Sequence, residues 1–104
     1  MKIKKIIDGK KYNTETGILL ASQEYESRGS WKHLHEQLYK SVKGAYFIAY
    51  EGGPLSRYGI DIGNRQVSSS KGIYLISEEE AKEFMAKHTD ADKYEKEFGN
   101  IQEG

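Results

Sequence analysis

The 104-residue sequence contains no cysteine, one proline and no long run of apolar residues. Without cysteine it can form no disulfide, thiolate metal site or cysteine nucleophile, which suits a reducing compartment. No stretch approaches the ~18 consecutive apolar residues of a transmembrane helix, and the basic start MKIKKII is too short in apolar residues for a secretory signal. We therefore expect a cytoplasmic protein without membrane contact.

The composition favours a small folded domain. Apolar residues make up 37% and charged residues 31% of the chain, whereas ~25% charged is usual. Aromatic residues reach 12%, with eight tyrosines, and disordered chains are poor in aromatics. Length and composition together predict a single domain over residues 1–104.

Formal net charge is zero, but the charges are separated along the chain. Residues 1–13 carry five lysines and one aspartate, and residues 77–104 carry nine acids and four lysines. The two ends could lie close and neutralise each other, or an acidic helical face could dock on a basic partner.

The first third of the chain predicts one hairpin and leaves a second element open. Residues 2–7 and 10–13 read as short strands joined by an Asp8-Gly9 turn. Residues 18–21 fit a helix capped at Thr14 or a short strand, because four apolar residues show no decisive period. Residues 22–30 predict a loop. Trp31, the only tryptophan, is expected in the core or at its rim, with a partner contact as the alternative.

The stretch 34–53 holds the densest apolar run and predicts the centre of a sheet. Two strands, 34–40 and 45–50, flank a turn at 41–44, and residues 72–76 predict a further strand. The four-residue turn does not determine the register. We expect the sheet to be anchored by four side chains: Leu38, Tyr46, Phe47 and Ile48.

The last third predicts two helices. Ser77 and Glu80 form a capping-box pattern, and an apolar stripe follows at Ala81, Phe84, Met85 and His88. A second helix follows the Thr89-Asp90 cap and ends at Gly99 in the left-handed conformation. The expected fold class is α+β, with a small antiparallel sheet of about four to five strands and two C-terminal helices packed on one face.

Residues 51–72 are rich in glycine and serine and contain the only proline. They predict a long connecting loop with room for a short strand at 58–62, or a binding surface that uses Arg57, Tyr58, Arg65 and Lys71. The segment matches neither the phosphate-binding loop GxxxxGK[ST] nor the dinucleotide pattern GxGxxG.

No catalytic or metal-binding motif is present in the sequence. His33 and His35 alternate on a predicted strand beside Glu36, but a third ligand close in sequence is lacking. No GxSxG motif occurs, and the paired carboxylates fall in helical runs that read as solvated. We therefore expect no enzyme activity, no cofactor and no metal.

Three segments carry a family resemblance: KKIIDGKKYNTET at 4–16, LYKSVKGAYFIAYEGGPLSRYG at 38–59 and LISEEEAKEF at 75–84. The chain resembles a group of small proteins from phages and other mobile elements of Gram-positive bacteria. Gly17 stands where that group usually has alanine, Phe84 stands where it has tryptophan, and the segment between Tyr25 and Trp31 looks variable.

Some members of this group resemble anti-CRISPR proteins against Cas9-type effectors. The resemblance implies an inhibitor that acts in the host cytoplasm on a bacterial defence nuclease or its guide RNA, as a monomer or weak homodimer. The contact surface would be the glycine-rich loop or an acidic helical face formed by Glu78, Glu79 and Glu83. The alternative is a nucleic-acid-binding accessory protein whose phosphate contacts come from seven basic residues: Lys2, Lys4, Lys5, Lys10, Lys11, Arg57 and Arg65.

Overall fold

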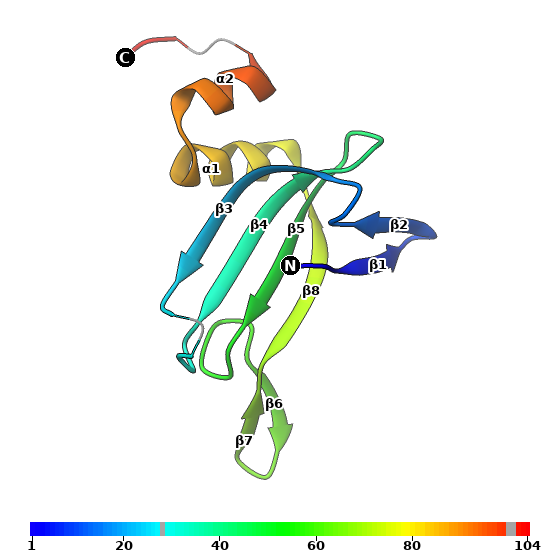
Figure 1. Cartoon of the computed structure of the whole chain (residues 1–104), viewed down its shortest axis with the longest axis vertical. Coiled ribbons are helices and arrows are strands. Elements are labelled where there is room, and N and C mark those ends of the chain that lie inside the picture. Colours follow the sequence, from blue (N-terminus) through cyan, green and yellow to red (C-terminus); the bar gives the residue numbers. More distant parts are fainter. Residues whose placement is uncertain (28, 100–101) are drawn as a thin grey trace.

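The computed structural model describes residues 1–27, 29–99 and 102–104 and has an α+β fold. Four antiparallel strands form the main sheet in the order β3-β4-β5-β8 (Figure 1). They span Ile18–Tyr25, Leu34–Lys40, Tyr46–Gly52 and Ser70–Ile76. The expected central hairpin is therefore present as β4 and β5, and its register pairs Leu38 with Ile48 and Tyr39 with Phe47.

One face of the sheet packs against a two-stranded ribbon of β1 (Lys4–Ile7) and β2 (Lys10–Asn13). The expected Asp8-Gly9 turn joins the two strands, and both residues adopt a positive φ, 49° and 75°. Tyr12 reaches from the ribbon to the Phe47 ring at 5.8 Å, and Tyr39 stacks on Phe47 at 5.3 Å. Alternation along β4 and β5 therefore supplies this layer with its aromatic core.

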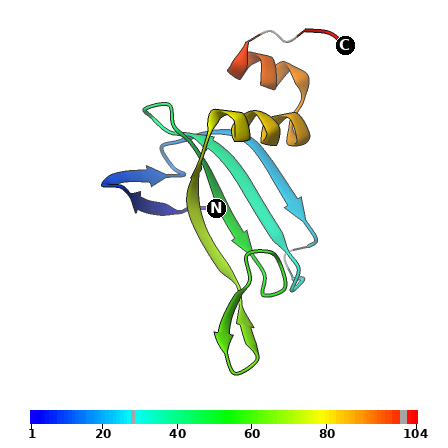
Figure 2. The same cartoon turned by 180° about the vertical axis from the view of Figure 1, so that it is seen from behind.

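Helix α1 (Glu78–His88) covers part of the opposite face (Figure 2). Its capping box is formed as expected: the Glu80 amide donates to the Ser77 hydroxyl, and the Ser77 amide donates to the Glu80 carboxylate. Ala81 and Met85 are buried, and they pack with three residues of the sheet: Ala21, Leu38 and Ile48. The sheet anchors thus divide between two faces, because Phe47 points toward the ribbon and not toward the helix.

Helix α2 (Ala91–Phe98) follows its Asp90 cap and reaches the sheet at Tyr46. The Phe98 ring lies 5.8 Å from the Tyr46 ring, and the Tyr46 hydroxyl donates to Glu97 at 2.6 Å. Gly99 ends the helix with φ 89° and ψ −179°, so the expected left-handed α conformation is wrong there.

Residues 18–21, for which a helix and a strand were both open, form the start of strand β3. The loop predicted at 22–30 is wrong for Ser22–Tyr25. These residues continue β3 and pair with β4 over their whole length. Their polar side chains find cross-strand partners, since Gln23 donates to Glu36 and Ser22 hydrogen-bonds to His35. A polar stretch can therefore remain in a strand.

Residues 51–72 are more ordered than a connecting loop. A short loop at 53–59 leads into a hairpin of β6 (Ile60–Gly63) and β7 (Gln66–Ser68), and β8 starts at Ser70. The strand expected at 58–62 starts two residues later and ends one residue later, as β6. In Figure 1 the hairpin projects from the end of the sheet opposite the helices, along the 51 Å axis of the molecule.

Candidate functional site

The loop at 53–59 folds back and joins the loop that precedes β4. The Gly53 amide donates to the His33 carbonyl at 2.7 Å, and the Leu55 amide donates to the Trp31 carbonyl at 2.8 Å. Gly53 also permits this close approach, because a Cβ there would lie 2.5 Å from the Trp31 carbonyl oxygen. Backbone hydrogen bonds therefore hold the two loops as one unit.

A buried carboxylate attaches this unit to the sheet. Glu36 is 1% exposed and accepts hydrogen bonds from the Arg57 guanidinium, the Tyr58 hydroxyl and the Gln23 amide. The Tyr58 ring stacks on Tyr50, with centroids 4.1 Å apart and planes 14° from parallel. A buried charge needs such partners to offset its desolvation. Arg57 and Tyr58 therefore act first as anchors for the loop.

Burial and the bond to Glu36 raise the pKa of Tyr58 well above its ordinary value. The phenol therefore stays protonated and serves as a donor. Burial lowers the pKa of Arg57, but the contacts with Tyr58 and Glu36 outweigh it and raise that pKa overall. Both groups keep the protonation states that the network needs.

The anchored loops present apolar side chains to solvent. Trp31 is 68% exposed, Leu55 54% and Ile60 49%. The expectation that Trp31 lies in the core or at its rim is therefore wrong. The Trp31 backbone carbonyl accepts the hydrogen bond from the Leu55 amide, while the indole side chain remains exposed to solvent. We call the exposed side chains of Trp31, Leu55 and Ile60, together with the half-buried Pro54, the loop-end surface.

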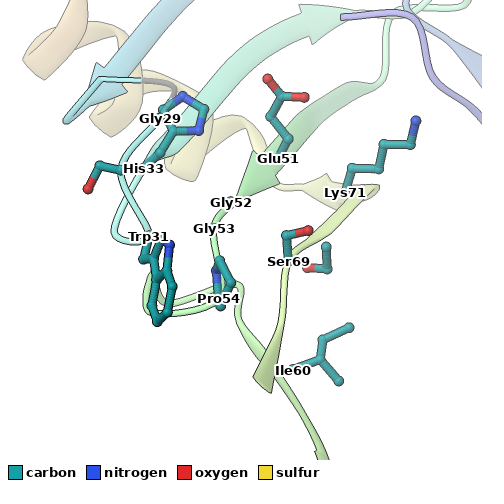
Figure 3. Close-up of a pocket in the computed structure, with 12 residues that line it drawn as sticks. Gly29, Trp31, His33, Glu51, Gly52, Gly53, Pro54, Ile60, Ser69 and Lys71 are labelled. Atoms are coloured by element: carbon teal, nitrogen blue, oxygen red, sulfur yellow. The ribbon is translucent and has the colours of Figure 1, made fainter. Parts of the chain in front are cut away.

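A hollow of about 830 Å³ opens beside this surface. Figure 3 shows Trp31 and Pro54 on one side, with Ser69, Lys71 and Ile60 across from them. Glu51 and His33 also line it. The volume falls in the range of ligand sites, ~300–1,000 Å³, and the mixed lining suits a protruding segment of a partner with apolar and charged groups.

The β6–β7 hairpin extends this end of the molecule. Asn64 and Arg65 form its tip, with φ of 52° and 58°, which is a left-handed pair typical of a type I′ turn. Ile62 is 59% exposed and Val67 45%. The tip holds Arg65 away from the Glu36 network.

The acidic residues considered for binding lie elsewhere. Glu78, Glu79 and Glu83 are exposed on α1, which sits at the other end of the sheet (Figures 1 and 2). Tyr58 and Lys71 thus lie at the loop end, whereas the Arg57 side chain extends over the sheet to Glu36. There Arg57 and Glu83 line one hollow of about 310 Å³, which is where the expected basic and acidic residues meet. Tyr50 contacts the loop through Tyr58, whereas Tyr39 stacks on Phe47 on the ribbon face.

His33, which immediately precedes β4, and His35 on β4 both lie near carboxylates. The His33 Nε2 is 3.3 Å from Glu24 Oε1, and the His35 Nδ1 is 3.8 Å from Glu51 Oε1. Among the described residues, no three His, Asp or Glu side chains are grouped to hold a metal ion. The described helices include none long and apolar enough to cross a membrane.

Sequence reasoning missed the central role of Glu36. Its signal was nevertheless present, because Glu36 lies between Leu34 and Leu38 on one face of a predicted strand. A charged residue at such a position requires a partner from another segment.

No protein-family model, curated protein or solved structure matches the chain.

Proposed function

We propose that this chain is a phage or mobile-element protein that inhibits bacterial defence by binding a Cas9-type effector through the loop-end surface. The observation that carries the binding role is an exposed tryptophan on a firmly anchored loop. The resemblance of segments 4–16, 38–59 and 75–84 to mobile-element proteins supports the choice of partner. The inhibitor acts by occupying a surface, without a chemical step.

The anchoring of Trp31 is what makes it suitable for binding. Tryptophan is enriched among the few residues that supply most of the energy of a protein interface. A flexible exposed side chain would lose conformational freedom on binding, whereas a pre-ordered loop loses less. The bonds from Gly53 and Leu55, and the Glu36 network behind them, order this loop before any partner arrives.

The test is DNA cleavage by purified Cas9-type effectors of Gram-positive hosts, loaded with guide RNA, in the presence of this protein. We expect inhibition by the wild type and co-elution with the effector. A Trp31→Ala, Leu55→Ala variant should need at least about tenfold more protein, since the loss of one interface anchor costs ~2 kcal/mol or more.

Val42→Ala is the matched control, because Val42 is 79% exposed and lies in the β4–β5 turn, away from the loop end. It should inhibit like the wild type. Cleavage that continues unchanged in excess wild-type protein, with no co-elution, would refute the proposed function. Equal loss in both variants would refute the loop-end surface as the contact.

The basic residues expected to contact nucleic acid in the accessory-protein alternative do not form one surface. The lysines at positions 4, 5, 10 and 11 lie on the β1–β2 ribbon, whereas Arg57 is bonded to Glu36 and Arg65 lies at the β6–β7 tip. Lys2 lies 3.6 Å from Glu15. Of the seven basic residues expected in this role, only the four lysines of the ribbon therefore lie together on one element.

A further inference from the structure

The β1–β2 ribbon carries the densest group of positive charge in the molecule. Lys4, Lys5, Lys10 and Lys11 are exposed, and Asp8 is the one acid on the ribbon. Within the described parts of the chain, none of these lysines forms a salt bridge. Figures 1 and 2 show the ribbon projecting sideways from the sheet, away from both helices.

The neighbouring β4–β5 turn adds a fifth cation. A hollow of about 360 Å³ separates this turn from the ribbon, and its lining includes Lys10, Lys11 and Lys43 but no acid. Lys43 is exposed and has no ion pair among the residues that the structure describes. Unpaired cations around an acid-free hollow are a suitable arrangement for an anionic partner.

The ribbon is firmly attached at its base. The Ile3 amide donates to the Thr14 hydroxyl at 3.0 Å, and the Thr14 amide donates to the Ile3 carbonyl at 3.0 Å. Tyr12 is buried against the sheet on the inner face of the ribbon. The register places Lys4, Ile6 and Lys11 on the outer face, so these two lysines project from a fixed support. Lys5 and Lys10 share the face of Tyr12 and are exposed beyond its buried ring.

We propose that the β1–β2 ribbon binds double-stranded DNA by entering the major groove, with its lysines and Lys43 contacting phosphates. The strands of a two-stranded ribbon lie ~4.8 Å apart, and the major groove of B-DNA, about 12 Å wide, admits such a ribbon. This role is independent of the loop-end surface, which lies at another part of the molecule.

The arrangement favours duplex DNA over other nucleic acids. The major groove of duplex RNA is deep and narrow and excludes a ribbon. Binding of single strands without sequence preference relies on exposed aromatic side chains for base stacking, but the ribbon's only aromatic residue, Tyr12, is buried beneath it. Because formal net charge is zero, binding must come from a local basic patch such as this one and not from the overall charge.

The experiment is fluorescence anisotropy of a short labelled DNA duplex, titrated with the full chain at several salt concentrations. We expect binding at low salt that weakens as salt rises. For a Lys4→Ala, Lys11→Ala variant, the slope of log K against log[salt] should be less steep by about 1.8, since each phosphate contact contributes ~0.9. Thermal unfolding should be unchanged, because both side chains are exposed.

Lys93→Ala, Lys96→Ala is the matched control, since these lysines are exposed on α2 at the helical end. It should bind as the wild type does, and duplex RNA of the same length should bind more weakly than DNA. Absence of DNA binding at low salt would overturn the proposal. So would an equal loss in the control variant, tighter binding to RNA, or binding to anionic lipid vesicles without binding to DNA.

Discussion

At the residue scale, Glu36 explains why a glycine-rich segment is ordered. Its carboxylate lies on the central strand β4, and it receives Arg57 and Tyr58 from the loop and Gln23 from β3. A single buried charge thus joins three segments that are distant in sequence. The loop-end surface depends on this residue although Glu36 itself is not exposed.

Arg57→Ala tests that dependence. The substitution leaves a buried carboxylate with one charged partner fewer, and we expect the free energy of unfolding to fall by about 1–3 kcal/mol. Arg65→Ala removes the same side chain from the exposed hairpin tip and should change stability by less than about 0.5 kcal/mol. Urea unfolding of the two variants measures the difference, and equal effects would show that the Glu36 network adds no stability.

At the scale of elements, the Glu97 carboxylate and the Phe98 ring hold the C-terminal end of the α2 helix on Tyr46. Burial raises the pKa of Glu97, but the bonds from Tyr46 and Lys40 outweigh burial and bring that pKa below its ordinary 4.5. Lys40 Nζ lies 2.9 Å from Glu97 Oε2. A carboxylate with a lowered pKa stabilises the folded state at higher pH, and this contribution is lost as pH falls through the folded pKa.

Wild type and Glu97→Gln should therefore differ in stability at neutral pH and converge in acid. We expect the gap in free energy of unfolding to be full above the ordinary carboxyl pKa of 4.5 and to close as pH falls through the lowered pKa of the folded state. Thermal or urea unfolding across this range measures it. A gap that stays constant with pH would contradict the role of the charged carboxylate.

The contact between the two loops predicts a sharp difference between two glycines. Gly53→Ala would place a Cβ 2.5 Å from the Trp31 carbonyl oxygen, so the loops must separate. We expect a loss of about 1–3 kcal/mol in the free energy of unfolding. Gly29→Ala meets nothing within 4 Å and should be nearly neutral in the same assay. Equal stability of both variants would show that the loops are not closely joined.

Local patterns revealed most of the elements. The Asp8-Gly9 turn, the strands around 34–50 and the Ser77–Glu80 capping box each carry their own signal, and each element is present. The strand at Ser22–Tyr25 has no such local signal, because Ser22 and Gln23 find their side-chain partners on β4, which the sequence does not place beside them. Residue type alone predicts Trp31 in the core or at its rim, whereas its position follows from a hydrogen bond with Leu55, 24 positions away.

At the scale of the whole molecule, packing is uneven from one end to the other. The centre of the sheet is covered by the ribbon on one face and by α1 on the other, whereas the β6–β7 hairpin keeps Ile62 and Val67 exposed. An isolated two-stranded hairpin is only marginally stable in water. The two ends of the long axis should therefore differ strongly in local stability.

Hydrogen exchange measured by mass spectrometry tests this difference. Amides of β4 and β5 should exchange only through global opening, and those of β6 and β7 should exchange far faster. The β1–β2 ribbon, which is anchored by Tyr12 and Thr14, should fall between them. Equal protection of β6–β7 and the central strands would contradict the expected difference.

The exposure of Trp31 also determines which changes of the protein its fluorescence can detect. Since this is the only tryptophan and its indole is 68% exposed, the native protein should fluoresce much like tryptophan in water. Unfolding in denaturant should then shift the emission spectrum little, although the sheet is lost. Coverage by a partner at the loop end should instead shift the emission toward the blue. The tryptophan fluorescence of this protein should thus respond little to unfolding and strongly to binding of a partner at the loop end.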